Sequence, residues 1–158
     1  MAMTQVQTPI GLLTVVAGAA GVQQILFDGQ PPPTGASDEP AGAVLDEAAA
    51  QLRQYFAGDR TSFDFPIDLR GTAFQQKAWL ALATIPFGET ISYGEQARRV
   101  GRPTAARAIG AANGRNPVPI VLPCHRVIGA SGALTGFGGG LDVKQALLEH
   151  ERRVGAGS

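Results

Sequence analysis

Residues 116–128 read Asn-Pro-Val-Pro-Ile-Val-Leu-Pro-Cys-His-Arg-Val-Ile, and they hold the only cysteine of the 158-residue chain, Cys124, followed directly by His125. The three prolines of this stretch fix φ and remove backbone N–H donors, which excludes the interior of a helix and limits loop motion. We therefore predict a stiff, strand-like segment. A thiol delivered by such a segment, with an imidazole beside it, is suited to act as a pre-aimed nucleophile.

Upstream of this stretch, the sequence predicts two short helices joined by a glycine turn. Ser92-Tyr-Gly-Glu95 has the form of a capping box, with serine at the N-cap and glutamate at N3, and it predicts a helix to about Val100. Gly101 is a suitable stop, and Pro103 is a suitable first residue for a second helix, over about 103–112. This is a helix-turn-helix pattern, although many helical hairpins bind nothing.

The second of these helices has small residues around a single arginine, Arg107. Small side chains let a helix backbone approach a groove of DNA closely, and one long cation can then enter the duplex. The alternative is an exposed arginine that pairs with phosphate or carboxylate. The candidate DNA-contacting residues of this helix are Thr104, Ala105, Ala106, Arg107, Ala108 and Gly110.

Downstream of the Cys-His pair lie a glycine-rich loop, Gly136–Gly140, and a predicted helix from Asp142 to about Arg153. The loop lacks the lysine and spacing of a phosphate-binding loop, so close approach of its backbone to a planar base is the better interpretation. Glu151 lies on the same stripe of the helix as Leu147 and Leu148. An inward-facing carboxylate usually has a partner, whereas a surface position at a frayed helix end is the alternative.

The first 70 residues predict a small α+β domain without recognisable chemistry. Its expected elements are a strand meander (Thr4–Thr8, Leu12–Ala17 and Val22–Phe27), a proline-rich loop (Gln30–Gly42), an amphipathic helix (about 43–57) and an extended segment (Phe63–Leu69). Thr72 can cap a further helix that carries Phe74, Ala78 and Leu82 on one face. With a boundary at Asp68–Thr72, we predict domains 1–70 and 71–158, the second mostly helical.

The net charge is zero, but the charges are unevenly distributed. Residues 1–70 carry 3 Lys or Arg and 8 Asp or Glu, hence a charge of −5, whereas residues 71–158 carry 10 and 5, hence +5. A basic half beside an acidic one is expected where one domain meets phosphate, although chance clustering of surface charge gives the same pattern. No apolar run is long enough for a membrane span. No positive segment precedes the apolar residues 10–22, so we expect no signal peptide.

Pro-Cys-His-Arg-Val at 123–127 resembles the active-site motif of the O6-alkylguanine-DNA alkyltransferases, also called methylated-DNA–protein-cysteine methyltransferases. Further blocks resemble those of the family and stand in the same order: Phe87-Gly-Glu-Thr-Ile-Ser-Tyr93, Ala105-Ala-Arg-Ala-Ile-Gly110, Asn116-Pro-Val-Pro119, and Gly139-Gly-Leu141 with Leu147-Leu-Glu-His-Glu151. The resemblance is strong over roughly residues 72–151 and weak over the first 70.

The resemblance implies irreversible, single-turnover transfer of an alkyl group from O6-alkylguanine in double-stranded DNA to Cys124. It implies a relay in which Glu151 orients His125, His125 takes a proton through water, and Cys124 attacks. Neighbouring residues on an extended segment point to opposite faces, so we expect no direct contact between the thiol and the imidazole. A free thiol with a pKa of about 8.5 is only a few per cent thiolate at pH 7, so we expect activation to lower this pKa.

By the same resemblance, the second helix lies in the minor groove, Tyr93 crowds the phosphate of a flipped nucleotide, and Arg107 fills the space that this nucleotide leaves. Asn116 braces the turn between the second helix of the helix-turn-helix and the segment that carries Cys124. Core packing and turn capping are the alternatives for Tyr93 and Asn116. Many family members have a tyrosine where this chain has Phe137, so a hydroxyl donor to N3 of guanine is missing here. The expected base pocket comprises Asn113, Val127, Phe137 and Gly138.

We expect neither a cofactor nor a metal, since one cysteine and two histidines leave little for a zinc site. We expect no membrane partner and a monomer in solution, and we leave open whether copies cluster on DNA. If the source is a prokaryote, the expected location is the cytoplasm. Three other functions compete with alkyl transfer: a non-enzymatic sensor of alkylated bases with the same fold, a helix-turn-helix regulator, and a cysteine hydrolase. Cys124 argues against the sensor.

Overall fold

The computed structural model of the chain describes residues 1–35, 42–132 and 137–156. Residues 36–41 of the expected loop Gln30–Gly42, and Gly136 of the expected glycine-rich loop, lie outside the described residues. The chain divides into two compact units, Met1–Arg70 and Gly71–Ser158. The first combines a sheet with one helix and the second is mostly helical, so the expected α+β fold class is confirmed.

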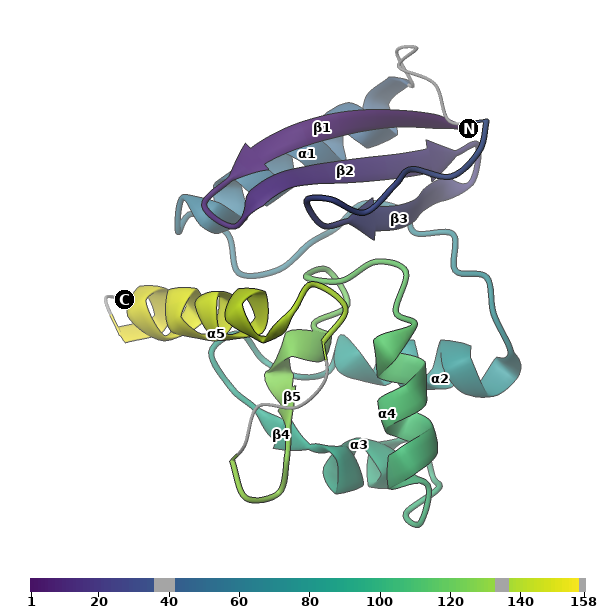
Figure 1. Cartoon of the computed structure of the whole chain (residues 1–158), viewed down its shortest axis with the longest axis vertical. Helices are drawn as coiled ribbons and strands as arrows, with labels where there is room; N and C mark the ends of the chain where they lie inside the picture. Colours follow the sequence, from purple (N-terminus) through teal and green to yellow (C-terminus); the bar gives the residue numbers. More distant parts are fainter. Residues whose placement is uncertain (36–41, 133–136, 157–158) are drawn as a thin grey trace. The chain divides into compact units, whose positions relative to one another are not determined.

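Three antiparallel strands form the sheet of the first unit, in the order β1-β2-β3 (Figure 1). They are β1 (Ala2–Thr8), β2 (Gly11–Gly18) and β3 (Gly21–Leu26). Val15 pairs with Ile25 across the sheet, and both side chains are buried. The meander expected from the apolar runs is therefore confirmed.

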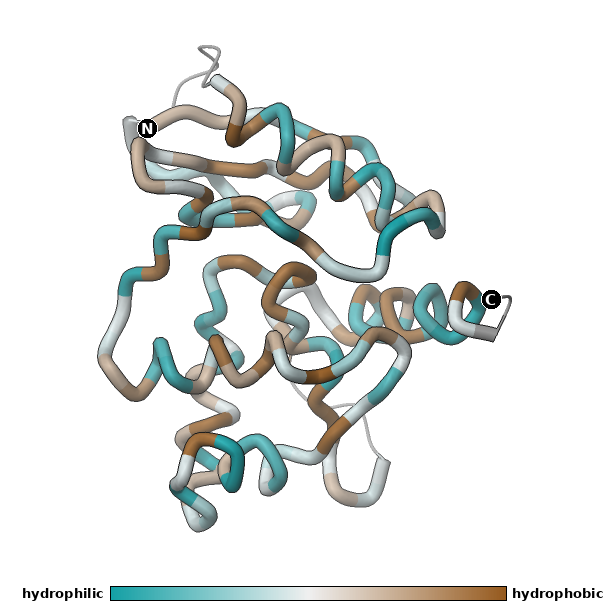
Figure 2. The backbone as a smooth tube through the Cα atoms, turned by 180° about the vertical axis from the view of Figure 1, so that it is seen from behind, coloured by the Kyte–Doolittle hydropathy of each residue, from teal (hydrophilic) through white to brown (hydrophobic). Residues whose placement is uncertain are grey.

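Helix α1 (Gly42–Phe56) lies along this sheet and contacts all three strands (Figure 1). Its buried stripe includes Leu45, Ala48, Leu52 and Tyr55, at the spacing of one helix face. Figure 2 shows the resulting alternation of hydrophilic and hydrophobic turns along the helix. Burying one such leucine contributes about 1.5–3 kcal/mol, so packing on the sheet holds this helix in place.

The chain after α1 runs beside β3 as a short extended segment. The N–H of Val22 donates to the carbonyl of Pro66 at 2.9 Å, and the N–H of Asp68 donates to the carbonyl of Val22 at 2.9 Å. A Cβ atom on Gly21 would lie 2.6 Å from the Pro66 carbonyl oxygen, so this close approach requires glycine. The extended segment expected at Phe63–Leu69 thus pairs with the sheet.

The second unit opens with helix α2 (Ala73–Leu82), which begins where the sequence places a cap. The Thr72 hydroxyl accepts from the N–H of Gln75 at 3.1 Å, and the Gln75 side chain accepts from the N–H of Thr72 at 3.0 Å. This reciprocal capping box satisfies donors that the helix start otherwise leaves unpaired. The buried face carries Ala78 and Leu82, as expected, and also Trp79.

Helices α3 (Tyr93–Arg99) and α4 (Ala106–Gly114) form the helix-turn-helix (Figure 1). The hydroxyl of Ser92 accepts from the N–H of Glu95 at 3.1 Å and caps α3, as expected. The Glu95 carboxylate pairs with Arg98 and Arg99, so only the serine half of the expected capping box is found in the described residues. The expected start of α4 at Pro103 is wrong. The N–H of Ala105 donates to the carbonyl of Arg102 at 2.9 Å, so Pro103 is the second residue of a tight turn, a position that suits its fixed φ.

A two-stranded parallel sheet and a terminal helix complete the second unit. Strand β4 (Ile91–Ser92) pairs with β5 (Val127–Ile128), which brings the start of α3 beside the residues that follow the Cys-His pair. Helix α5 (Leu141–Ala156) covers the helix expected from Asp142. No helix within the described ranges is long and apolar enough to cross a membrane.

Candidate active site

Cys124, His125 and Arg126 form a single 3₁₀ turn, η1 (Cys124–Arg126), between Pro123 and β5. The N–H of Arg126 donates to the carbonyl of Pro123 at 2.9 Å and closes the turn. The expected extended conformation at Cys124 is therefore wrong. Pro123 lies at the N-cap, where its missing N–H is not needed, so the proline stiffens the entry to the turn without opposing it.

Asn116 holds the segment that leads into η1. Its Nδ2 donates to the carbonyl of Leu122 at 2.7 Å, and its Oδ1 accepts from the N–H of Val118 at 3.0 Å. These two bonds close a loop whose far end lies two residues before Cys124. Asn116 also interacts with the Cys124 side chain and favours the ionised form of the thiol.

Three buried side chains from η1 and α5 form one hydrogen-bonded group. Nε2 of His125 lies 2.7 Å from Oε2 of Glu151. The same carboxylate accepts from Nε of Arg126 at 2.8 Å and from Nη2 at 2.9 Å. Arg126 donates its remaining nitrogen, Nη1, to the carbonyl of Ile85 at 2.6 Å. The two hydrogen bonds from Arg126 to Glu151 make a bidentate arginine–carboxylate pair, which is stronger and better oriented than a single hydrogen bond.

The charges in this group follow from these contacts. Burial alone opposes ionisation of Glu151, but hydrogen bonds from His125 and Arg126 hold its pKa well below the ordinary range. Burial lowers the pKa of His125 against the opposing pull of Glu151. The imidazole is therefore neutral, with its proton on the Nε2 that faces the carboxylate. Nδ1 of His125 is buried and has no hydrogen-bond partner among the described residues, so it is free to accept a proton.

Burial also raises the pKa of the Cys124 thiol, to about 11, against the opposing effects of Asn116 and Lys144. The expectation of a lowered pKa is therefore wrong for the protein without DNA. A thiol with this pKa is protonated at neutral pH. The thiol must therefore lose its proton after a substrate has bound, because it does not do so in the free protein.

Lys144 and Arg126 also belong to the site, and neither is among the residues predicted from the sequence. The Lys144 side chain is fully buried, and its Nζ donates to the carbonyl of Val127 at 2.7 Å. Nζ also lies 6.0 Å from the centre of the Tyr93 ring. The spacing of Lys144 to Leu147, Leu148 and Glu151 places all four on one helix stripe, which is the signal that could have identified it.

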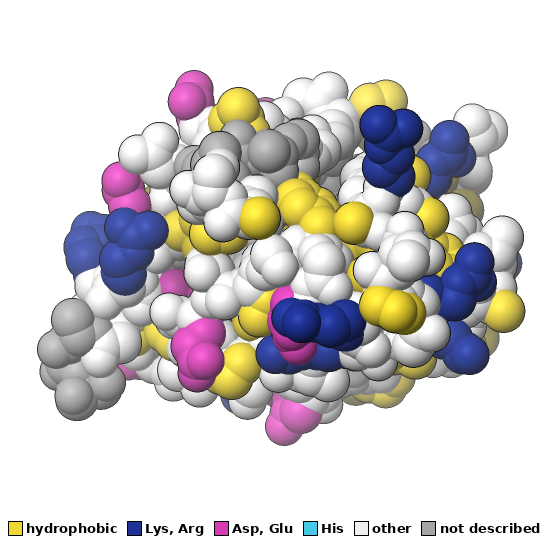
Figure 3. Space-filling view, turned by 90° about the horizontal axis from the view of Figure 1, so that it is seen from below, with side chains coloured by type: hydrophobic (Ala, Val, Ile, Leu, Met, Phe, Trp, Pro, Cys, Tyr) yellow, Lys and Arg dark blue, Asp and Glu magenta, His cyan; other side chains and the backbone are white. Residues whose placement is uncertain are grey.

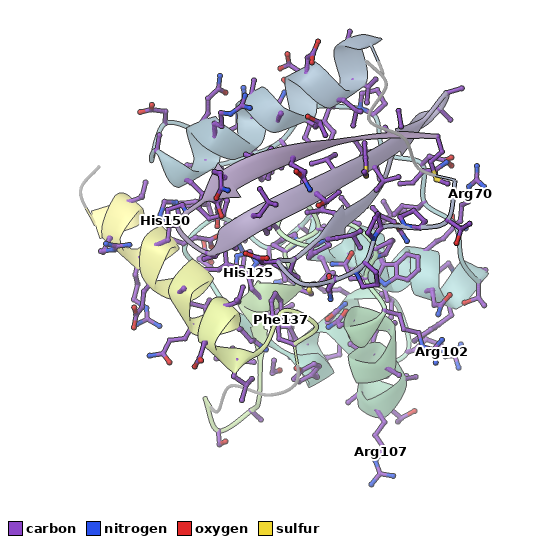
Figure 4. The ribbon with its side chains drawn as sticks, turned by 45° about the horizontal axis from the view of Figure 1, so that its top comes forward. Arg70, Arg102, Arg107, His125, Phe137 and His150 are labelled. Carbon is purple, nitrogen blue, oxygen red and sulfur yellow. The ribbon has the colours of Figure 1, made fainter. Side chains whose placement is uncertain are left out.

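The candidate DNA-contacting residues lie on and just before α4. Thr104, Arg107 and Ala108 are exposed, whereas Ala105, Ala106 and Gly110 are partly buried. Thr104 and Ala105 precede the helix. Figure 4 shows that the Arg107 side chain extends away from α4. Figure 3 views the second unit from the side of α3 and the α3–α4 turn, and Lys and Arg side chains stand at several places there with apolar side chains between them.

The four expected pocket residues have different environments. Val127 is fully buried in β5, Phe137 is partly buried, and Gly138 is exposed. Asn113 lies in α4, where both its side-chain polar atoms pair with Gln96. This pairing favours a structural role for Asn113 over contact with a base.

Known proteins resemble both units of the chain. The family model for the DNA binding domain of 6-O-methylguanine DNA methyltransferase matches residues 73–153, and the model for its ribonuclease-like domain matches residues 1–69. A methylated-DNA–protein-cysteine methyltransferase of Mycolicibacterium paratuberculosis is 54% identical over 154 residues, which cover 94% of this chain and 90% of that protein. The corresponding Mycobacterium tuberculosis protein is 50% identical over 148 residues, covering 93% and 90%.

A solved structure of the OGT protein of Mycobacterium tuberculosis in complex with DNA has the same fold. Its TM-score to this chain is 0.91 at 49% sequence identity, and the match covers 98% of this chain and 94% of that one.

Proposed function

The chain belongs to the 6-O-methylguanine DNA methyltransferase family, and from this premise we propose that it repairs alkylated DNA by moving the alkyl group from O6 of guanine to Sγ of Cys124. The observation that carries the proposal is the hydrogen bond between His125 and Glu151 beside a buried cysteine. The carboxylate fixes the tautomer of the imidazole, and the imidazole offers as the base its Nδ1, which has no hydrogen-bond partner in the described part of the chain.

The proton of the Cys124 thiol passes to Nδ1 of His125 through a bridging water, and Glu151 stabilises the imidazolium that forms. Because Arg126 already neutralises the carboxylate, Glu151 stays ionised before and after the transfer. Lys144 and Asn116 favour the thiolate as it develops. The raised pKa of the resting thiol keeps the thiolate of Cys124 a minor species at neutral pH until a substrate fills the site.

The thiolate attacks the alkyl carbon in line with the bond to O6. A sulfur–carbon bond forms as the carbon–oxygen bond breaks, and the electron pair of the broken bond stays on guanine. O6-alkylguanine lacks the N1 proton that guanine carries, so the proton given up by the thiol balances the one that the product gains. The thioether is not cleaved again, so each molecule acts once. No step requires a cofactor.

The reacting atom lies inside the base stack, so the nucleotide must be flipped out, which costs a few kcal/mol. We assign Tyr93 to the phosphate of the flipped nucleotide and Arg107 to the space that it leaves. The exposed position of Arg107 supports this assignment. The small neighbours Ala106 and Ala108 allow the α4 backbone to approach the minor groove.

Phe137 forms an aromatic wall beside the base without donating a hydrogen bond to it. We expect the departing guanine to be stabilised less strongly than in relatives with a tyrosine at this position. Val127 and Gly138 contribute to the same pocket. We assign the DNA-binding and chemical steps to residues 71–158 and a structural or regulatory role to residues 1–70.

The non-enzymatic sensor is not favoured, because the nucleophilic cysteine is present. The bacterial origin of the mycobacterial relatives supports a cytoplasmic location with association with the nucleoid during repair.

Nucleoside analysis of a duplex that contains one O6-methylguanine tests the proposal. With limiting protein, we expect one guanine to be restored for each protein molecule, with no abasic site. Turnover beyond one equivalent, or a released base, would point to a hydrolase or glycosylase. Binding without any restored guanine would point to the sensor.

A further inference from the structure

A reciprocal amide pair lies between the two helices of the helix-turn-helix. Nδ2 of Asn113 in α4 donates to Oε1 of Gln96 in α3 at 2.8 Å, and Nε2 of Gln96 donates back to Oδ1 of Asn113 at 2.9 Å. Nε2 of Gln96 also donates to the carbonyl of Ala78 at 3.0 Å. The pair therefore connects α3, α4 and α2 through three hydrogen bonds.

The surroundings of this pair are apolar. The Gln96 side chain is fully buried, and the adjoining core consists of Ala78, Ala97, Ile109 and Ala112, with Phe74, Tyr93 and Val100 against it. Two apolar side chains could fill the same space without the desolvation of two amides. A polar pair adds what apolar contacts lack, because its hydrogen bonds form only at one relative position of the two helices.

The position of the pair connects the DNA-contacting residues to the nucleophile. Tyr93 lies one helical turn before Gln96, and its ring faces Gly110 of α4, where an added Cβ would come within 3.9 Å of it. Asn113 lies three residues before Asn116, which fixes the loop that ends at Leu122, two residues before Cys124. A shift of α4 along α3 would therefore move Arg107 and Cys124 relative to Tyr93.

We propose that the Gln96–Asn113 pair is a positioning device that sets the helix-turn-helix for the flipping of a nucleotide from duplex DNA. This inference rests on the proposed function, and it assigns the pair to the duplex-dependent step rather than to the chemistry of Cys124. It predicts that variants of the pair slow the reaction with duplex DNA without changing the chemical reactivity of Cys124.

The test compares two reactions of Cys124: with O6-methylguanine in a duplex, and with iodoacetamide, which does not require DNA. The double variant Gln96→Leu/Asn113→Leu leaves no unpaired amide, so its fold is retained, as urea unfolding will check. We expect its duplex reaction to fall about 10- to 100-fold, because small displacements of remote groups have effects of this size, with an unchanged iodoacetamide rate. The exchanged pair Gln96→Asn/Asn113→Gln should recover part of the duplex rate.

Gln145→Leu is the matched control, since Gln145 is an exposed amide on α5 that donates to Glu149 one turn further along the same helix. A double variant that repairs duplex DNA at the wild-type rate would overturn the inference, and so would an equal loss in both reactions. If the wild-type protein transferred no alkyl group, the proposed function would fail separately. The affinity for undamaged duplex would then test the positioning role. A weaker affinity in the double variant would support it, and an unchanged affinity would contradict it.

Discussion

Glu151 and Arg126 lie on α5 and η1, 25 residues apart, and two hydrogen bonds of 2.8 and 2.9 Å join them in the interior of the second unit. The same carboxylate bonds to His125, so one side chain both neutralises a buried cation and fixes the imidazole. The geometry of the proposed base therefore depends on a pair whose two members stabilise each other as charged groups.

Substituting Glu151 by Gln removes the charge that compensates Arg126. Breaking one side of a buried ion pair costs about 3–5 kcal/mol, and we expect a loss of this order in the free energy of unfolding, measured with urea. The control is Glu149→Gln, an exposed carboxylate on the same helix, which should change little. Equal free energies of unfolding for the two variants would contradict a stabilising buried ion pair between Glu151 and Arg126.

The stability of the protein should fall in mild acid. The folded-state pKa of His125 is lowered by burial, so below about pH 6.5 the unfolded chain takes up a proton at this residue that the folded protein does not. The free energy of unfolding should therefore decrease as the pH falls from about 8 to about 5. Glu151 adds to the loss at lower pH, because its folded-state pKa is depressed. Urea unfolding at a series of pH values checks this, and an increase in stability on acidification would contradict it.

Lys144→Met should make Cys124 harder to ionise. The Lys144 charge favours the thiolate, so its removal raises the pKa of the thiol, and each unit of that shift lowers the thiolate fraction about tenfold. The measurement is the pH dependence of the rate with iodoacetamide. Lys77→Met removes an exposed lysine of the same unit and serves as the control. An unchanged pH profile for Lys144→Met would show that Lys144 serves packing alone.

Phe137→Tyr should accelerate transfer from damaged duplex by supplying the missing donor to the leaving guanine. One hydrogen bond of about 1 kcal/mol in the transition state corresponds to roughly a fivefold faster rate. The iodoacetamide rate should stay the same, because that reaction has no guanine leaving group. A duplex rate that does not rise would place the Phe137 ring away from the departing base.

Much of the fold can be predicted from short stretches of sequence. Thr72 and Ser92 cap helices where the sequence places them, and the apolar stripe that ends at Tyr55 identified α1. These features depend on a few residues close together in the chain. The start of α4 was placed wrongly, because Pro103 suits both the first turn of a helix and the second position of a tight turn.

The interior of the site could be predicted only in part. The apolar stripe on α5 indicated that Glu151 faces inward, but its pairing with Arg126 depends on the contact between α5 and η1. Lys144 lies on the same stripe and was overlooked because lysine is seldom buried. The thiol pKa depends on the burial of Cys124, which no neighbouring residue in the sequence reveals.

The most direct test of alkyl transfer to Cys124 is the intact mass of the protein after reaction with duplex DNA that carries one O6-methylguanine. Unmodified duplex and a Cys124→Ala variant are the controls, and peptide mapping locates the modification. We predict a gain of one CH2 group on Cys124, never more than one per molecule, and no gain in either control. A wild-type protein that binds the damaged duplex with no change in mass, or one that is modified elsewhere than at Cys124, would contradict the mechanism.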